Sequence, residues 1–400
     1  MSLFQLPLST LSLPENGLFG DIPIAIANLS YLTLLDLRTN MFYGSIPKGI
    51  TKCTSLKRLK VSHNKLSGNL DIDFPKSMEV LSLDSNNLCG TLPASLAKCT
   101  NLQLLDLRKN RFTGELPTYL AFLHDLRVLS VGYNKLQGEI PQWITDLTKL
   151  QVLDLSNNKF SGRIPLNLER LQGFKIVGSS KLSSNTLYDD LEIVVKGVDQ
   201  KLIYVLASNT IFDLSNNNLM GEIPTSIGSL SSLRLLNLSR NQLGGKILAS
   251  LSDISSTLEE LDLSRNNLSG YIPLELAKLT MLALLDLASN RFCSPIPKST
   301  QFDTFSVTSF ERNKCLCGNP LQACNEKQNQ NTSIMRGIDT SKCGGLLSCV
   351  NEHVSLIALG LGMGIGFGGV VSLMTLWDKL RNWVVLPKRQ SFYGVYRFPK

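Results

Sequence analysis

The side chains best suited to catalysis are few and scattered in this 400-residue chain. Only three histidines occur, His63, His124 and His353, and none stands in a motif with a nucleophile or a carboxylate partner. Residues 364–369 spell G-x-G-x-x-G. A nucleotide loop needs a preceding strand and a polar phosphate site, whereas this segment lies inside an uncharged apolar run. We therefore expect no enzyme, no nucleotide and no other cofactor.

The nine cysteines could serve as metal ligands or as disulfide partners. Cys315 and Cys317 form a C-x-C pair to which a third cysteine could be added in a metal site. Secreted and extracellular chains use such cysteines for disulfides instead, and we expect disulfides and no metal here. Cys53 and Cys99 precede Thr-Ser-Leu and Thr-Asn-Leu, and we expect both to be small buried apolar residues. The odd total leaves at least one thiol unpaired within the chain.

A repeating frame of asparagines must position any functional side chain. Most steps between these residues are 24 residues long, and most members close a segment of the form L-x-L-x-x-N-x-L-x-G. The frame consists of Asn16, Asn40, Asn64, Asn86, Asn110, Asn134, Asn158, Asn217, Asn241, Asn266 and Asn290. A fixed period of this size predicts a stacked solenoid. Solenoids present long surfaces to partners, so the frame favours binding over catalysis.

One repeat shows the physical logic. Leu35 and Leu37 alternate inward on a short strand, so Asp36 and Arg38 face outward. Asn40 comes next at the turn, where a buried amide can bond backbone groups of its own and the next coil. One coil cannot bury its own apolar side, but eleven stacked coils can.

The frame is interrupted in two places. The step from Asn64 to Asn86 is two residues short, and the step from Asn158 to Asn217 is 59 residues long. The longer step predicts an insertion at 166–207. Within it, apolar residues alternate over 191–195 and a turn comes at 196–197, which predicts an ordered hairpin.

Cationic and aromatic side chains stand on the outward face of the N-terminal repeats. The ligand-binding candidates are Arg38, Arg58, His63, Arg108, Lys109, Arg127 and Tyr133. Arginine suits carboxylate or sulfate, so these residues predict an acidic ligand. The alternative is internal pairing with Asp36 and Asp106. The matching C-terminal positions, such as 156–157 and 215–216, carry small uncharged polar residues, serine and asparagine. We expect the N-terminal repeats to discriminate ligands and the C-terminal ones to dock a shared partner.

The spacing L-x-x-L-x-L-x-x-N-x-L-x-G-x-I-P resembles the plant-specific class of leucine-rich repeats. YDDLEIVVKGVDQKLIY (188–204) resembles the island of plant receptor-like proteins. FDLSNNNLMGEIPTSIGSL (212–230), LDLSRNNLSGYIP (261–273) and QFDTFSVTSFERNKCLCGNPLQAC (301–324) are similar to the segments on the C-terminal side of that island in the same family. The resemblance implies an α/β solenoid with a parallel sheet on its concave face. It also implies a Cys317–Cys324 disulfide in a C-terminal cap. The island residues that match are Tyr188, Asp189, Lys196, Gly197 and Tyr204.

The resemblance also implies a function. Receptor-like proteins of the Cf and CLAVATA types lack a kinase domain. They bind an extracellular peptide, protein or glycan ligand and signal through receptor kinases, which act as adaptor and co-receptor. Met1 to Leu13 shows neither the signal peptide nor the cysteine-paired cap that this family has, which predicts an N-terminally truncated receptor.

Residues 354–376 contain no charged side chain and are long enough to cross a bilayer as one helix. The tail beyond it has six basic residues and one acidic residue, so it supplies +5 of the net charge of +8. By the positive-inside rule the tail is cytoplasmic, and the basic balance indicates topology rather than nucleic acid. Gly360, Gly364 and Gly368 lie on one helix face and predict pairing with a partner's membrane helix. The alternative is that glycine is simply common in membrane helices.

The expected layout joins these segments into a single-pass plasma-membrane protein. It comprises about seven repeats at 1–165, the island at 166–207, about four repeats at 208–300, a cap and juxtamembrane segment at 301–353, the membrane helix at 354–377 and the cytoplasmic tail at 378–400. Sequons for N-glycosylation begin at Asn28, Asn237, Asn267 and Asn331. A defence role is expected, with developmental peptide perception, a decoy or truncated fragment, and a polygalacturonase inhibitor as alternatives.

Overall fold

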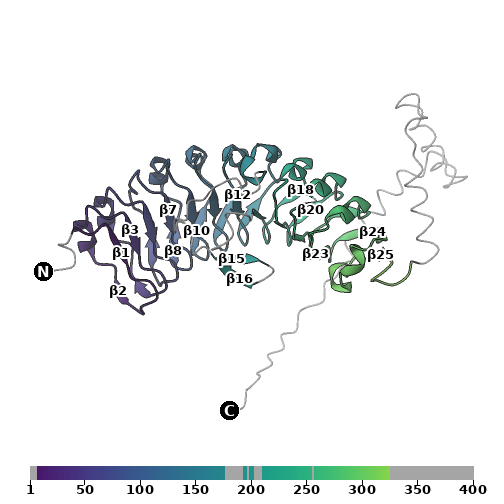
Figure 1. Cartoon of the computed structure of the whole chain (residues 1–400), viewed down its shortest axis with the longest axis horizontal. Helices are drawn as coiled ribbons and strands as arrows, with labels where there is room; N and C mark the ends of the chain where they lie inside the picture. Colours follow the sequence, from purple (N-terminus) through teal and green to yellow (C-terminus); the bar gives the residue numbers. More distant parts are fainter. Residues whose placement is uncertain (1–6, 176–191, 196–197, 202–209, 255, 325–400) are drawn as a thin grey trace, which may run out of the picture. The chain divides into compact units, whose positions relative to one another are not determined.

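The computed structural model describes residues 7–175, 192–195, 198–201, 210–254 and 256–324. The chain divides into two compact units, residues 1–332 and 333–400, and every described residue belongs to the first. Figure 1 shows this unit as a stack of coils, with strands along the concave side and short helical turns along the convex side.

The concave side is one parallel sheet of eleven strands. In sheet order its strands are β1 (Thr10–Ser12), β3 (Leu34–Asp36), β5 (Arg58–Lys60), β7 (Val80–Ser82), β9 (Leu104–Asp106), β11 (Val128–Ser130), β13 (Val152–Asp154), β17 (Ile211–Asp213), β19 (Leu235–Asn237), β21 (Glu260–Asp262) and β23 (Leu284–Asp286). Each coil adds one strand, because the inward leucines repeat with the period of the coil. The central residues Leu35, Leu59 and Leu105 are fully buried.

A second set of short parallel strands comes after the turn in each coil. The five-stranded part of this set contains β6 (Ser67–Asn69), β8 (Asn87–Gly90), β10 (Arg111–Gly114), β12 (Lys135–Glu139) and β14 (Lys159–Ser161). The remaining members are β2 (Phe19–Asp21), β4 (Met41–Tyr43), β18 (Met220–Glu222), β20 (Gln242–Gly244), β22 (Ser269–Gly270), β24 (Arg291–Pro295) and β25 (Cys315–Cys317).

The return segments on the convex side are 3-10 helices. They are η2 (Ile24–Asn28), η3 (Lys48–Lys52), η4 (Ala94–Lys98), η5 (Thr118–Phe122), η6 (Gln142–Asp146), η7 (Leu168–Arg170), η8 (Gln172–Phe174), η10 (Thr225–Ser229), η11 (Ala249–Ile254), η12 (Leu274–Lys278), η13 (Phe302–Thr304) and η14 (Val307–Ser309). The described residues contain no α-helix, which corrects the α/β expectation. Most of these segments are five residues or shorter and begin after a proline such as Pro47, so a tight single turn forms in place of an α-helix.

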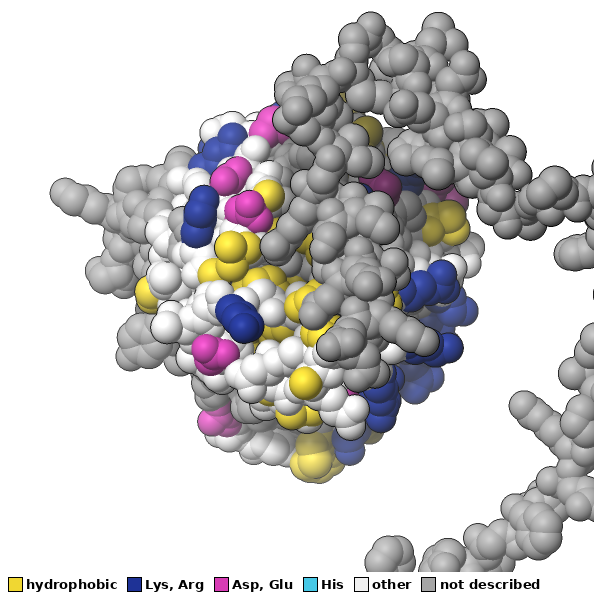
Figure 2. All heavy atoms as spheres, turned by 90° about the vertical axis from the view of Figure 1, so that its right-hand side faces the viewer, with side chains coloured by type: hydrophobic (Ala, Val, Ile, Leu, Met, Phe, Trp, Pro, Cys, Tyr) yellow, Lys and Arg dark blue, Asp and Glu magenta, His cyan; other side chains and the backbone are white. Residues whose placement is uncertain are grey.

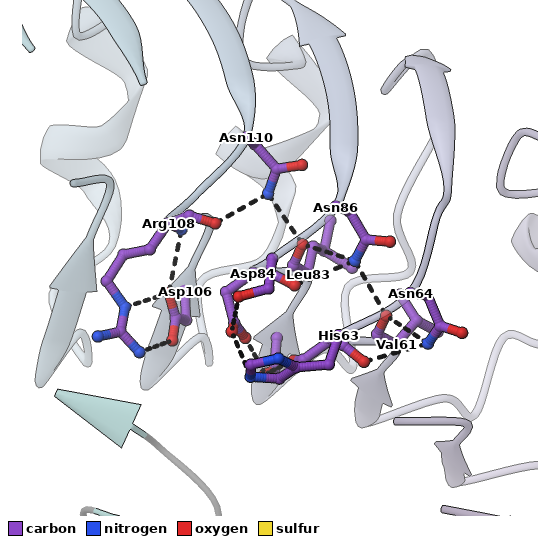
Figure 3. Close-up of polar contacts among 12 residues, drawn as sticks. Val61, His63, Asn64, Leu83, Asp84, Asn86, Asp106, Arg108 and Asn110 are labelled. Carbon is purple, nitrogen blue, oxygen red and sulfur yellow. Dashed lines mark hydrogen bonds and ion pairs between the residues drawn. The ribbon is translucent and has the colours of Figure 1, made fainter. Parts of the chain in front are cut away.

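The asparagines form a hydrogen-bonded ladder through the stack (Figure 3). The amide Nδ2 of Asn110 donates to the carbonyl oxygens of Leu107 and Arg108 in its own coil and of Leu83 in the preceding coil. Its Oδ1 accepts the backbone N–H of Leu88, also in the preceding coil, at 2.9 Å. The intercoil bonds of each amide therefore join it to the coil before it, not to the next one as expected.

The ladder extends one coil beyond the sequence frame. Asn313 donates to the carbonyls of Leu287 and Phe310, and its Oδ1 accepts the N–H of Phe292 at 3.1 Å. This asparagine caps the last coil. The L-x-L pattern is lost before it, which is why periodicity alone missed it.

Neither interruption of the frame breaks the concave sheet, which stays continuous through both. The two residues missing before Asn86 shorten the convex return, since the fully described residues 70–79 form no 3-10 helix. The 59-residue step leaves β13 paired directly with β17. The coil's own turns continue through η7 and η8 to Phe174, which packs edge-on against Phe212 with centroids 6.0 Å apart, so residues 168–174, within the predicted insertion, pack as part of the coil.

The insertion contains the expected hairpin. β15 (Glu192–Val195) pairs antiparallel with β16 (Val198–Lys201), with Val195 opposite Val198.

The five matching island residues lie outside the described residues, as do the predicted membrane segment at 354–377 and its three glycines. Within the described part of the chain, no helix is long and apolar enough to cross a membrane.

Candidate ligand-binding groove

A groove of about 480 Å³ runs along the concave face between the coils of Arg108 and Asp286. Of the predicted ligand-binding residues, Arg108, Lys109 and Tyr133 contribute to its lining. Most of its lining comes from later coils, none of whose residues is among the predicted ligand-binding residues. The structure therefore places the groove mainly on the C-terminal half.

The floor of the groove is a row of carboxylates. The same strand position carries Asp154, Asp213, Asp262 and Asp286, with Asn237 interrupting the row between β17 and β21. Adjacent strands lie about 4.8 Å apart, so these side chains are neighbours across the sheet. We call this row, with its asparagine, the acidic floor.

Each floor residue also has a structural role. Its Oδ1 accepts the backbone N–H two residues on, as in the bond from Ser215 to Asp213 at 2.8 Å and from Ser239 to Asn237 at 3.1 Å. This local bond stabilises the turn that leads out of the strand. Because asparagine fills the same role at 237, the turn needs only the oxygen acceptor and not the negative charge.

Burial and mutual repulsion perturb these carboxylates. Burial raises the pKa of Asp213 from its ordinary value of 3.8 to about 8, and the neighbouring charge of Asp154 adds to the rise. Burial likewise raises the pKa of Asp286, and the nearby Asp262 adds to it. A carboxylate whose pKa is raised in this way would ionise more readily beside a cation.

Arg108, one of the arginines expected to bind an acidic ligand, is paired with Asp106 inside the chain (Figure 3). Nε and Nη2 of Arg108 donate to the two carboxylate oxygens of Asp106 at 3.0 and 2.9 Å, and only 6% of the Arg108 side chain is exposed. Burial raises the pKa of Asp106 to about 7, while the guanidinium of Arg108 opposes the rise. Arg38 pairs with Asp36 in the same bidentate way at 2.8 and 2.7 Å. The structure shows the internal-pairing alternative at both arginines.

The other N-terminal candidates lie outside the groove. His63 contacts Asp84, with Nε2 3.5 Å from Oδ2, and 38% of its side chain is exposed (Figure 3). Arg58 and Arg127 are half-buried on the concave face and do not line the groove. The structure thus splits the predicted set into groove residues and residues outside the groove.

Sequence reasoning missed the acidic floor. The predicted ligand-binding residues came mainly from the positions that follow each strand, whereas the floor residues are the last residues of the strands. The signal was present in the recurring Leu-Asp-Leu triplets at 153–155, 261–263 and 285–287.

The cysteines separate into bridged and free groups. Cys317 is bonded to Cys324, the pair implied by the resemblance, and Cys293 is bonded to Cys315, a pair not anticipated. Cys53 and Cys99 are free and fully buried, and burial raises the pKa of Cys99 to about 11. Cys89 is free and half-buried. No group of side chains suited to hold a metal ion occurs among the residues that the structure describes.

The sequons lie in different environments. Asn28 is exposed at the end of η2, on the convex side. Asn267 is half-buried, and its Oδ1 accepts a bond from Arg291 at 2.7 Å. Asn237 stands in the acidic floor and lines the groove. Asn331 lies outside the described residues.

Comparison with known proteins agrees with this architecture. Models described as leucine rich repeat match residues 52–69, 77–99, 100–160, 210–230, 232–254 and 257–279. This chain is built of leucine-rich repeats. No protein of curated function matches it in sequence.

Solved structures with similar repeats include plant receptors. The PEPR1–AtPEP1 complex is 29% identical with a TM-score of 0.59, covering 77% of this chain and 42% of that one. The plant peptide hormone receptor RGFR1, in complex with RGF2, is 25% identical with a TM-score of 0.56, covering 77% and 52%. This leucine-rich-repeat chain therefore spans about half the length of the receptors it resembles.

A third similar structure is named for a different function. A plant ice-binding protein is 26% identical with a TM-score of 0.54, covering 79% of this chain and 83% of that one. Repeats of this kind therefore occur in proteins with different functions, and the function depends on the site they carry.

Proposed function

We propose that this chain is a receptor-like protein that binds an extracellular peptide in the concave groove. The observation that carries the proposal is the groove itself, a depression of about 480 Å³ with an acidic floor. One similar structure, RGFR1 in complex with RGF2, is named as a plant peptide hormone receptor, which supports the same role here.

The chemistry of the floor favours a peptide with a basic group. Asp154, Asp213 and Asp262 are not ion-paired to any described lysine or arginine. A ligand lysine or arginine above them would relieve the repulsion that raises the pKa of Asp213. An acidic ligand would meet this repulsion directly, and Arg38 and Arg108 are already occupied.

The rest of the proposal concerns the whole protein. Residues 354–377 would anchor the repeats outside the plasma membrane, and Gly360, Gly364 and Gly368 would contact the membrane helix of a receptor kinase. That kinase would transmit the signal across the membrane. The island hairpin would contribute to ligand contact, and defence is the role we favour over developmental peptide perception.

Glycosylation fits this proposal at some sequons better than at others. Glycans at Asn28 and Asn267 would leave the acidic floor open, whereas a glycan at Asn237 would fill the groove. We therefore propose that the ligand-binding form is unmodified at Asn237.

A groove-filling variant tests the proposal. Asn216 is exposed, lines the groove and has φ of 52°, a conformation that Tyr133 adopts at the equivalent position. Asn216→Tyr should therefore place an aromatic ring in the groove without backbone strain beyond that of its neighbours. Thr225→Tyr, exposed on η10, is the matched control on the convex side.

The measurement is retention of peptides from plant extracellular fluid by the immobilised full chain, read by mass spectrometry. Wild type and Thr225→Tyr should retain the same peptides, enriched in lysine or arginine, and Asn216→Tyr should lose them. Equal retention by all three proteins would contradict a ligand site in the groove.

A further inference from the structure

The two positions flanking each ladder asparagine lie between the concave strand of a coil and its second strand, or at the start of that second strand. Of the preceding positions, Lys109, Tyr133 and Arg240 line the concave groove. We define the basic rim as these flanking residues in the coils from Asn64 to Asn313. In the N-terminal coils the rim carries Lys65, Arg111, Lys135 and Lys159, among others. No aspartate or glutamate occupies any rim position. The rim is thus separated in charge from the acidic floor beside it.

The rim continues through the C-terminal coils. There it carries Arg240, Arg265, Arg291, Arg312 and Lys314. β13 pairs directly with β17, so the long insertion does not separate the two halves of the rim. With strands about 4.8 Å apart, the ten coils from Asn64 to Asn313 extend roughly 40 Å along the rim.

Two lysines of the rim are not neutralised within the described part of the protein. Lys135 and Lys159 are exposed and make no ion pair with any described carboxylate. Lysines elsewhere behave differently, as in the pairs Lys48–Asp71 at 2.6 Å and Lys98–Asp73 at 2.7 Å. Figure 2 shows lysine and arginine side chains gathered along one side of the repeats, with mixed charges on the other side.

The C-terminal end of the rim contains a formed groove. Arg291, Arg312 and Lys314 line a depression of about 550 Å³ together with Phe292 and Asn290, and its lining includes no carboxylate. Nη2 of Arg291 donates to Oδ1 of Asn267, and Nε of Arg312 lies 3.6 Å from Oε1 of Glu311. Lys314 makes no ion pair with a described residue. Three cationic side chains with one weak counter-charge thus line this end of the rim.

We infer that the basic rim binds a linear acidic polysaccharide of the polyuronate type. Such a polymer carries one carboxylate per sugar, and an extended sugar unit is comparable in length to the spacing between coils, so charges can meet along the whole rim. A single-stranded nucleic acid would need a row of aromatic side chains for its bases, and the rim has only the separated rings of His63 and Tyr133. This inference goes beyond the proposed peptide groove, because it concerns the rim and not the acidic floor.

Charge-neutralising variants test the inference with polygalacturonate as the probe. Lys135→Gln/Lys159→Gln removes two rim charges, and Arg291→Gln/Lys314→Gln removes two at the C-terminal groove. Lys48→Gln/Lys98→Gln is the matched control, with the same loss of charge on the convex side. Each rim variant removes two exposed charges that would pair with ligand carboxylates, so it should weaken binding of the full chain about tenfold, and the control less than about twofold.

Polymer length and chemistry provide two further arms. Binding of a galacturonate trisaccharide should be weakened by Arg291→Gln/Lys314→Gln alone, since a trisaccharide is long enough to contact only one end of the rim. Fully methyl-esterified polymer should not bind. Equal weakening by the rim and control variants would show a net-charge effect and overturn the inference. Binding of single-stranded DNA as tight as that of polygalacturonate at physiological salt would overturn it as well.

Discussion

The asparagine ladder gives the sharpest quantitative prediction. In Asn110→Ala the carbonyl of Leu83 keeps a second donor, the amide of Asn86, and the carbonyl of Leu107 keeps the amide of Asn134. The N–H of Leu88 has no such alternative, because Asn110 Oδ1 is its acceptor and Leu88 is buried. One orphaned buried donor costs about 1–3 kcal/mol and the weakened carbonyl bonds add about 1 kcal/mol. We expect a loss of roughly 2–4 kcal/mol in the free energy of unfolding.

The assay combines chemical denaturation with amide hydrogen exchange of the full chain. Exchange should accelerate at Leu88 and its neighbours, because the opening is local to two adjacent coils. Asn218→Ala is the control, since Asn218 is exposed and its side chain makes no hydrogen bond to a described residue. A loss below about 1 kcal/mol for Asn110→Ala, or unchanged exchange at Leu88, would refute this assignment of donors and acceptors.

An isosteric variant separates the contribution of the acceptor oxygen of the amide from that of its donor nitrogen. Asn110→Asp keeps the oxygen that accepts from Leu88 but points a second oxygen at three carbonyls. It should destabilise the protein at neutral pH at least as much as Asn110→Ala. Wild-type stability of Asn110→Asp would show that the donor bonds contribute nothing.

The groove and the cysteines give three further predictions. The raised pKa of Asp213, about 8, means that the folded state holds a proton which the unfolded state releases near pH 3.8. The free energy of unfolding should therefore fall as the pH rises between these two values. Asp213→Asn should flatten that fall in denaturation curves measured from pH 4 to 8. Arg108→Ala should cost about 3 kcal/mol by leaving a buried carboxylate unpaired, and a loss below about 1 kcal/mol in thermal unfolding would contradict this. A thiol reagent should label Cys89 in the native chain and reach Cys53 and Cys99 only after unfolding, which peptide mapping would show.

The acidic floor and the basic rim divide the concave side into two electrostatic zones. A basic peptide and an acidic polymer could occupy them at once, because the two ligands would attract rather than displace each other. Binding of the peptide fraction with and without polygalacturonate would measure this coupling: we expect equal or tighter peptide retention in its presence, and competition would contradict the division.

The sequence by itself determined the stack of coils. Each coil contacts mainly its neighbours, so the spacing of Asn40, Asn64 and the later members is enough to predict the strands, their parallel order and the hairpin within the insertion. It did not predict the extra coil at Asn313, where the leucine pattern is lost, or the 3-10 turns on the convex side.

Only the tertiary structure decided which polar side chains act together. Stacking places residues that are 24 or 59 positions apart in the chain about 4.8 Å apart in the sheet, so isolated aspartates become an acidic floor and isolated lysines become a basic rim. The same stacking buries Arg108 against Asp106 and removes it from the set of residues available to a ligand. The period is a local property of the chain, whereas charge accumulation and pairing depend on neighbours that only the folded stack supplies.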